Sequence, residues 1–197
     1  MIKLYIADVS ALDIPAALER VTLTRREKAM RLCGDLNKRQ SLGAALLMYK
    51  AVNGGVPFDY SVGENGKPYC EGLWHFSLSH CGELAVCAVS DRPVGVDIEC
   101  PRKNSLRLAE RIFAPEVCEV IAGSDEPDEK FCEYWTCAES FIKQTGEGIA
   151  KGMQRLDLLT LSKSKSLKHM KYGDCHISVC IASGDIGDID IHDEKII

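Results

Sequence analysis

The sequence predicts an α+β fold, a pseudo-twofold arrangement of two similar α+β lobes in one chain. Two observations lead to this fold class. In each half of the chain, segments with helical periodicity come before short apolar alternations that are typical of strands. The 197 residues are also enough for one large domain or two small ones with a real core. We place the boundary near residues 90–93, which gives lobes of residues 1–92 and 93–197.

The first lobe is expected to open with a strand at residues 4–7, followed by one or two helices within residues 24–49. The glycines and the proline of residues 53–57 end this helical pattern. A turn is expected at residues 65–68, and residues 76–79 alternate like a strand that runs into His80.

A hairpin is expected at the lobe boundary, where residues 84–89 would pair with residues 94–98. Three helices are then expected, at residues 107–113, 115–121 and 130–145. Residues 156–161 and 176–182 are expected to form strands, separated by a solvated loop that includes residues 162–166. The acidic tail from Ser183 onward is expected to be frayed.

Composition excludes several classes of function. The net charge of -5 argues against a surface that grips nucleic acid or a membrane by bulk charge. No apolar run approaches the roughly 20 residues that cross a bilayer. The chain contains ten cysteines, but its opening residues lack the pattern of a secretory signal. We therefore expect a cytoplasmic protein with reduced thiols, most of them small core residues. No Cys-x-x-Cys pair is present, which disfavours a zinc site.

Three carboxylates in two segments are the most informative feature. In residues 94–99, two valines and an isoleucine alternate with Gly95, Asp97 and Glu99, so a strand would put both acids on the face opposite its apolar side chains. Same-face neighbours on a strand are roughly 6.5–7 Å apart. Two negative charges this close favour a cation between them, and Mg²⁺ prefers such oxygen ligands.

The third carboxylate, Glu139, lies in a predicted helix. Trp135, Glu139 and Lys143 are spaced i, i+4, i+8 and therefore share one helix face. A simple exposed ion pair between Glu139 and Lys143 would explain this spacing equally well. The two acids of residues 94–99 favour a cation site instead.

Polar and cationic residues elsewhere suit a phosphate ligand. Lys67, Ser79 and His80 supply donors, and the helical segment contains a basic cluster that includes Arg25 and Lys28. For the basic cluster the alternative is a solvated helix face, and for His80 a structural histidine. No Gly-x-x-x-x-Gly-Lys-Ser/Thr loop is present, so a P-loop is excluded.

Four motifs in order resemble the 4′-phosphopantetheinyl transferases of the surfactin-synthetase-activating (Sfp) type. They are Gly66-Lys67-Pro68, Phe76-Ser77-Leu78-Ser79-His80, Gly95-Val96-Asp97-Ile98-Glu99 and residues 135–143, and the resemblance covers most of the chain. The resemblance implies a monomer with coenzyme A between two lobes and Mg²⁺ on its pyrophosphate. The implied reaction converts an apo acyl or peptidyl carrier protein into its holo form.

The resemblance also implies residue roles. Asp97, Glu99 and Glu139 would hold the Mg²⁺ ion, and Glu139 or a magnesium-bound water would accept the proton of the carrier serine. Lys143 would contact the phosphates and assist the leaving group. Besides Lys143, coenzyme A would contact five further positions: Arg25, Lys28, Lys67, Ser79 and His80.

One position departs from the family pattern, because Ala138 stands where a lysine usually precedes the helix glutamate. The missing lysine leaves open a catalytically silent protein that still binds coenzyme A or the carrier. A separate alternative is an interaction domain without a ligand. Residues 113–121 are a candidate docking face for an acidic carrier, although such apolar residues are more often core.

Overall fold

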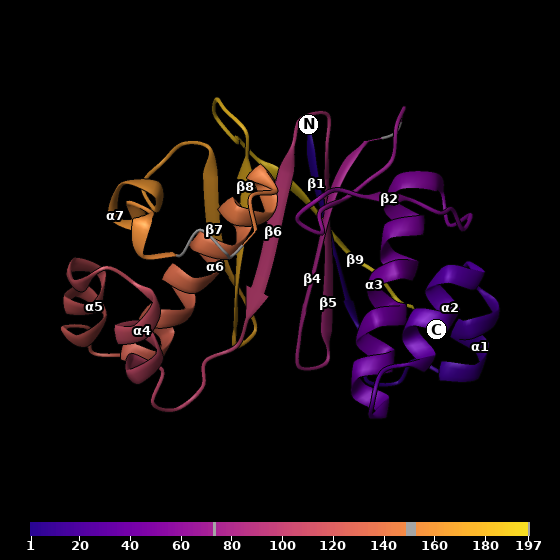
Figure 1. Ribbon diagram of the computed structural model, residues 1–197, viewed down its shortest axis with the longest axis horizontal. Coiled ribbons are helices and arrows are strands. Elements are labelled where there is room, and N and C mark those ends of the chain that lie inside the picture. Colours follow the sequence, from indigo (N-terminus) through magenta and orange to yellow (C-terminus); the bar gives the residue numbers. More distant parts are fainter. Residues whose placement is uncertain (73, 149–152, 197) are drawn as a thin grey trace. The chain divides into compact units, whose positions relative to one another are not determined.

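The structure is a computed structural model that describes residues 1–72, 74–148 and 153–196 (Figure 1). It contains both helices and sheets, which confirms the predicted α+β class. Its contacts divide the chain into two compact units, Met1–Pro93 with Asp188–Ile197, and Val94–Gly187. The pseudo-twofold relation of two similar lobes and the division into residues 1–92 and 93–197 stay predictions.

The first unit contains a four-stranded sheet in the order β4-β5-β1-β9. Its strands are β1 (Ile2–Asp8), β4 (His75–Cys81), β5 (Leu84–Ser90) and β9 (Ile189–Asp193). Strand β1 pairs antiparallel with β5 along its whole length and parallel with β9 on its other edge. Strand β1, buried from Leu4 to Ala7, is therefore the centre of this sheet and confirms the predicted first strand.

The predicted hairpin between residues 84–89 and 94–98 is wrong. Strand β5 pairs with β4 instead, with Cys81 opposite Leu84 across a two-residue turn. Gly82 has a φ of 54° in this turn, and tight two-residue hairpins need such left-handed residues. Because the other edge of β5 is occupied by β1, no edge remains for residues 94–98, which pair elsewhere.

The tail expected to be frayed contains β9, so this prediction is also wrong. Its pairing with β1 places Ile2 opposite Ile189 and Tyr5 opposite His192. The Tyr5 and His192 rings stack with centroids 4.6 Å apart. Ile196 then packs against the core of the unit. The tail is ordered because it pairs with β1, a strand distant in sequence. Its acidic composition does not reveal this pairing.

The helices of the first unit are α1 (Ile14–Glu19), α2 (Leu23–Met30) and α3 (Asp35–Asn53). Of these, α3 lies on the sheet, and the other two pack against α3 (Figure 1). Helix α3 packs on β4 and β5 and ends at Gly54, which adopts the left-handed conformation of a C-cap. The short strands β2 (Ser61–Val62) and β3 (Pro68–Tyr69) pair across the predicted turn. Two helices within residues 24–49 and a turn at 65–68 are thus confirmed.

The second unit contains a three-stranded antiparallel sheet in the order β6-β8-β7. Its strands are β6 (Val94–Glu99), β7 (Leu167–Tyr172) and β8 (Cys175–Ile181), and its helices are α4 (Leu106–Ile112), α5 (Pro115–Ala122), α6 (Pro127–Thr145) and α7 (Leu158–Leu161). A 3₁₀ turn lies at Met153–Arg155. Helix α6 packs across β6 and β8, as Figure 1 shows. The three predicted helices and the strand at residues 176–182 are confirmed.

The strand expected at residues 156–161 is a helical turn instead. Asp157 accepts a hydrogen bond from the backbone N–H of Thr160 at 3.0 Å, which caps α7 at its first turn. Leu158 packs into the apolar cluster beneath α6. The apolar run therefore reflects burial of a short helix, and apolar runs of this length do not distinguish helix from strand.

A disulfide joins Cys100 to Cys175, with Cα atoms 4.2 Å apart. The β6–β8 register pairs Glu99 with His176, so these cysteines are the next cross-strand pair. The expectation of reduced thiols is wrong for this pair, because cysteines far apart in sequence meet only through strand pairing. The other eight cysteines are thiols outside this disulfide. Among the described helices, none has the length and apolar character to span a bilayer.

Gly95 lets α6 approach β6 closely. A Cβ atom at this position would lie 1.9 Å from the carbonyl oxygen of Ser140 and 2.5 Å from the backbone nitrogen of Gln144. Both atoms belong to the backbone of α6, so a side-chain rotation cannot relieve the clash. A side chain at residue 95 would force the helix away from the strand.

We predict that Gly95→Ala destabilises the protein by about 2–4 kcal/mol, because the added methyl overpacks the interface between α6 and β6. Urea unfolding measures the change. Gly63→Ala is the matched control, since the nearest atom to its added Cβ would be the Lys67 carbonyl oxygen at an ordinary 3.6 Å. An effect of Gly95→Ala no larger than that of the control would contradict the close approach.

We also predict that replacing both Cys100 and Cys175 by Ser lowers the free energy of unfolding by about 4 kcal/mol, because the disulfide closes a long loop in the unfolded chain. The two cysteines are 75 residues apart in sequence. Urea unfolding without reductant measures the loss, with Cys33→Ser at an exposed free cysteine as the control. Equal unfolding midpoints for the double variant and the wild type would refute this assignment.

Candidate functional site

Two of the three predicted carboxylates meet between β6 and α6. Gly95, Asp97 and Glu99 alternate with apolar residues on β6, and the Gly95 contact shows that their face is turned toward α6. Asp97 and Glu139 are only 5% and 7% exposed. The Nζ atom of Lys143 donates a hydrogen bond to Oδ1 of Asp97 at 2.6 Å. The buried Asp97 and Glu139 and the partly exposed Lys143 therefore form one group, which we call the carboxylate pair with its lysine.

Glu139 lies in surroundings that disfavour its charged form. The pKa of its carboxyl group is raised, first by burial and then by the negative charge of Asp97, while Lys143 partly opposes the rise. Within the described part of the chain, Oε1 of Glu139 is buried and has no hydrogen-bond partner. The alternative of an exposed Glu139–Lys143 ion pair is therefore wrong. A buried carboxylate whose oxygen has no hydrogen-bond partner is suited to bind a cation.

Glu99 has a different setting at the end of the same strand. Its Oε1 accepts hydrogen bonds from Nη2 of Arg102 at 2.9 Å and from the backbone N–H of Cys100 at 3.3 Å. Its side chain is 18% exposed. The sequence analysis missed Arg102, although its spacing three residues after Glu99 is a signal for a local ion pair in the turn that follows the strand.

The donor set fits Mg²⁺ in part. Among the residues that the structure describes, no three His, Cys, Asp or Glu side chains are arranged to hold a metal ion. Mg²⁺ is commonly bound by one or two protein carboxylates together with waters and substrate phosphates. Asp97 and Glu139 would meet this smaller requirement, with the buried Oε1 of Glu139 as one ligand atom. The binding of the cation by Asp97, Glu99 and Glu139 stays a prediction.

The remaining positions of the α6 motif support the helix. Trp135 packs into the apolar cluster of the unit and stacks on Phe131 with ring centroids 5.8 Å apart. Ala138 is 0% exposed in the same cluster. These two side chains anchor α6 in the apolar cluster of the unit.

The basic residues predicted to bind coenzyme A lie in the first unit, and Arg25 is not solvated. It is 8% exposed, donates hydrogen bonds to the hydroxyl groups of Tyr60 and Ser41, and its guanidinium lies 5.6 Å from the Tyr60 ring centre. The alternative of a solvated helix face is therefore wrong for Arg25. Burial, followed by the charge of Arg25, lowers the pKa of Lys28. Two cations held this close favour an anionic ligand.

The other predicted ligand contacts lie on or near the edge strand β4. Ser79 is buried and His80 is exposed on this strand, and Lys67 is half-buried in the turn between β2 and β3. Strand β3 contacts β4. The sequence analysis missed Tyr60 and Ser41, because their contact with Arg25 joins α2, α3 and the segment before β2. A role of these residues in ligand binding stays a prediction.

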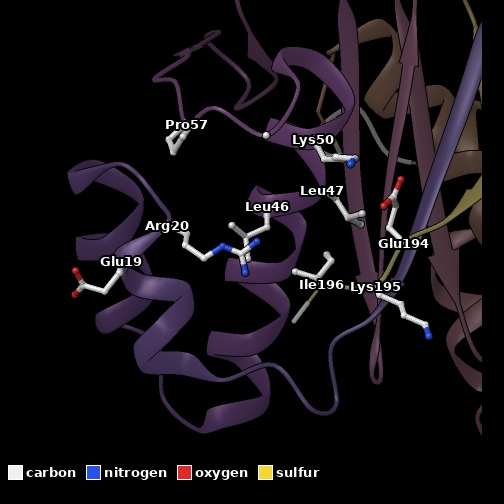
Figure 2. Close-up of a pocket in the computed structure, with 10 residues that line it drawn as sticks. Glu19, Arg20, Leu46, Leu47, Lys50, Pro57, Glu194, Lys195 and Ile196 are labelled. Carbon is white, nitrogen blue, oxygen red and sulfur yellow. The ribbon is translucent and has the colours of Figure 1, made fainter.

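A cavity of about 400 Å³ opens in the first unit, at a place other than the predicted site (Figure 2). Leu46, Leu47 and Ile196 form its apolar part, and charged residues of both signs surround it. Figure 2 shows Arg20 extending toward Leu46, whereas Glu19 points away. None of the residues expected to bind coenzyme A or the cation lines this cavity.

We predict that Glu139→Gln stabilises the metal-free protein at neutral and alkaline pH. Folding raises the pKa of Glu139 above its ordinary value of 4.5, so its stabilising contribution is full below that value and is lost as the pH rises through the folded pKa. Urea unfolding in chelator measures the difference between variant and wild type, which should shrink as the pH falls toward 4.5.

Glu129→Gln provides a control of opposite sign. Hydrogen bonds from Lys171 and then His176 lower the pKa of Glu129, so its contribution to stability is present above its ordinary pKa and lost on acidification. The Gln variant should be less stable than the wild type at neutral pH. A Glu139→Gln variant that loses stability in the same way would show that residue 139 is not a destabilised buried carboxylate.

Comparisons with known proteins identify relatives of this chain. Residues 93–188, which contain the carboxylate pair with its lysine, match the model of the 4'-phosphopantetheinyl transferase superfamily. The chain is 32% identical over 151 residues to a 4'-phosphopantetheinyl transferase of Bacillus subtilis, covering 72% of this chain and 67% of the relative.

Two further relatives match shorter parts. The chain is 33% identical to 4'-phosphopantetheinyl transferase Sfp of Bacillus subtilis (strain 168), over 64% of this chain and 60% of Sfp. It is 43% identical to 4'-phosphopantetheinyl transferase HetI of Nostoc sp., over 50% of this chain and 45% of HetI. The matches thus span about half to two thirds of these relatives' lengths. By its sequence matches and by the α+β structure that carries the matched residues, the chain belongs to the 4'-phosphopantetheinyl transferase superfamily.

Proposed function

We propose that this protein transfers the 4′-phosphopantetheine group of coenzyme A to a serine of an apo acyl or peptidyl carrier protein, in a Mg²⁺-dependent reaction that releases adenosine 3′,5′-bisphosphate. This is the activity of a holo-[acyl-carrier-protein] synthase. The observation that supports this proposal most is the carboxylate pair with its lysine, which lies inside the segment that matches the family. Both halves of the predicted site are in one chain, so a monomer is sufficient, and we propose a cytoplasmic one.

Asp97, Glu139 and Glu99 are the proposed holders of the cation. Asp97 and Glu139 are buried and present carboxylate oxygens between β6 and α6, and Glu99 is two residues from Asp97 on the same strand face. When bound, Mg²⁺ neutralises charge on the pyrophosphate of coenzyme A and on the departing bisphosphate. Arg102 holds Glu99 in a fixed position at the strand end.

Glu139 is the proposed proton acceptor. The serine oxygen forms a bond to the β-phosphorus of coenzyme A, the bond from this phosphorus to the leaving phosphate oxygen breaks, and the serine proton moves to the carboxylate or to an intervening water. A raised pKa suits this role, because a base accepts a proton best when its pKa approaches the working pH. Lys143, 29% exposed at its side chain, can add its positive charge to the departing phosphate.

The first unit supplies the proposed contacts to coenzyme A. Hydrogen bonds to Tyr60 and Ser41 fix Arg25. Burial and then the charge of Arg25 lower the pKa of Lys28, so the two cations are close together. Arg25 and Lys28 thus provide a preformed positive region for nucleotide phosphates. Lys67, Ser79 and His80 are the proposed further contacts. Because Arg25 is buried and already held in place, this region would need little reorganisation when coenzyme A binds.

The test is intact mass spectrometry of apo acyl and apo peptidyl carrier proteins, each incubated with this protein, coenzyme A and Mg²⁺, with a chelator control. We predict a gain of one phosphopantetheine that requires Mg²⁺. Glu139→Gln should lower the rate at least about 100-fold, because it removes a base and a cation ligand.

Glu133→Gln is the matched control for this variant. Glu133 lies on the same helix, but its carboxylate pairs with Lys130 at 2.7 Å and takes no part in the proposed chemistry. Its variant should transfer at the wild-type rate. Near-normal transfer by Glu139→Gln would remove Glu139 from the mechanism. Coenzyme A binding without transfer by the wild type would favour the catalytically silent binder, for which Ala138 is the sequence indication.

A further inference from the structure

The ion pair between Lys143 and Asp97 places an internal cation on a carboxylate that the proposed function assigns to Mg²⁺. The Nζ–Oδ1 distance is 2.6 Å, and the Asp97 side chain is 7% exposed. Glu139 lies one helical turn before Lys143 on α6, so the ammonium and both carboxylates are close neighbours. An ammonium at this distance occupies one oxygen of a carboxylate that would also hold the cation.

Charge balance explains why the lysine occupies this position. Two carboxylates buried side by side repel each other and lose hydration, and a nearby positive charge offsets part of both costs. Lys143 supplies one such charge from α6. Its side chain is 29% exposed, whereas the Asp97 side chain is 7% exposed. The long flexible stem of a lysine can move the charge without moving the helix.

We propose that Lys143 is an internal counter-cation that competes with the divalent cation for Asp97, and that cation binding moves the lysine ammonium off this carboxylate. The proposal rests on the proposed function for the identity of the cation and extends it to how the site is loaded. It requires only the ion pair with Asp97, whatever other contacts Lys143 and Asp97 make.

This exchange couples the cation to an anionic ligand. An ammonium displaced from Asp97 becomes available to a phosphate group of the incoming substrate. By thermodynamic linkage, a phosphate ligand that stabilises the displaced lysine strengthens cation binding, and the cation strengthens phosphate binding to the same extent. Without a phosphate ligand the lysine keeps the affinity for the cation low, so the two are expected to bind together.

Helix α6 contains a matched control for Lys143. Lys130 pairs with Glu133 at 2.7 Å, and their side chains are 33% and 29% exposed. The distance and the lysine exposure are close to those of the Lys143–Asp97 pair, but the carboxylate is not buried and belongs to no proposed cation site. A change specific to Lys143 therefore separates competition at the site from a general loss of positive charge on the helix.

The first experiment is a calorimetric titration of the metal-free full-length protein with Mn²⁺, a Mg²⁺ substitute, without coenzyme A or carrier protein. Lys143→Gln should bind Mn²⁺ about tenfold more tightly than the wild type, because a competing positive charge at contact distance is gone. Lys130→Gln should bind like the wild type. Circular dichroism checks that each variant is folded.

A second readout distinguishes displacement from simple charge repulsion and is made first on the wild-type protein. The amines of the wild-type protein are acylated briefly with acetic anhydride, and the modified lysines are identified by peptide mass spectrometry. Mn²⁺ should increase the labelling of Lys143 severalfold and leave Lys130 unchanged. Asp97→Asn should increase Lys143 labelling without any metal, because the charged partner is lost.

The results separate this proposal from the proposed function. Equal Mn²⁺ affinity of the wild type and Lys143→Gln, or Lys143 labelling that Mn²⁺ does not change, would overturn the competition and leave the transfer reaction standing. Absence of Mn²⁺ binding in the wild type and in both lysine variants would overturn the competition together with the cation site. Tighter binding with increased labelling supports the exchange.

Discussion

The candidate site depends on the close approach of α6 to β6 at Gly95. The backbone of α6 fills the space that a side chain at residue 95 would occupy. Asp97 is two residues further along β6, and Glu139 and Lys143 are on the helix that this glycine admits. The distance between the carboxylates is therefore set by a backbone contact, which is stiffer than any contact made by side chains alone.

Polar contacts fix the position of α6 along the rest of the sheet. The hydroxyls of Thr136 and Ser178 are 2.8 Å apart and fully buried. Nε2 of His176 lies 2.8 Å from Oε2 of Glu129. An interface held only by apolar packing tolerates small shifts of a helix, whereas buried hydrogen bonds lose their partners when the helix moves. These contacts thus keep Glu139 aligned with Asp97.

The site holds two mutually repelling carboxylates inside a well-packed unit. Glu139 and Asp97 are both buried, and each disfavours the charge of the other. The surrounding packing of Ala138, Ile142 and their neighbours offsets this cost. Proteins often retain such unfavourable charged groups at binding sites. A ligand that balances the charge relieves this destabilisation, and the free energy released strengthens its binding. Lys143 balances part of it in the absence of a ligand.

The sequence by itself determined the α+β class, the α6 helix and the face of β6 that carries its acids, because alternation and helical periodicity are local properties. Tertiary structure alone decided the partner of β5, the pairing of β9 with β1, the Cys100–Cys175 disulfide and the buried position of Arg25. It also decided that Lys143 pairs with Asp97. Each of these joins residues distant in sequence, and which of them meet depends on strand order and helix packing, which local patterns do not encode.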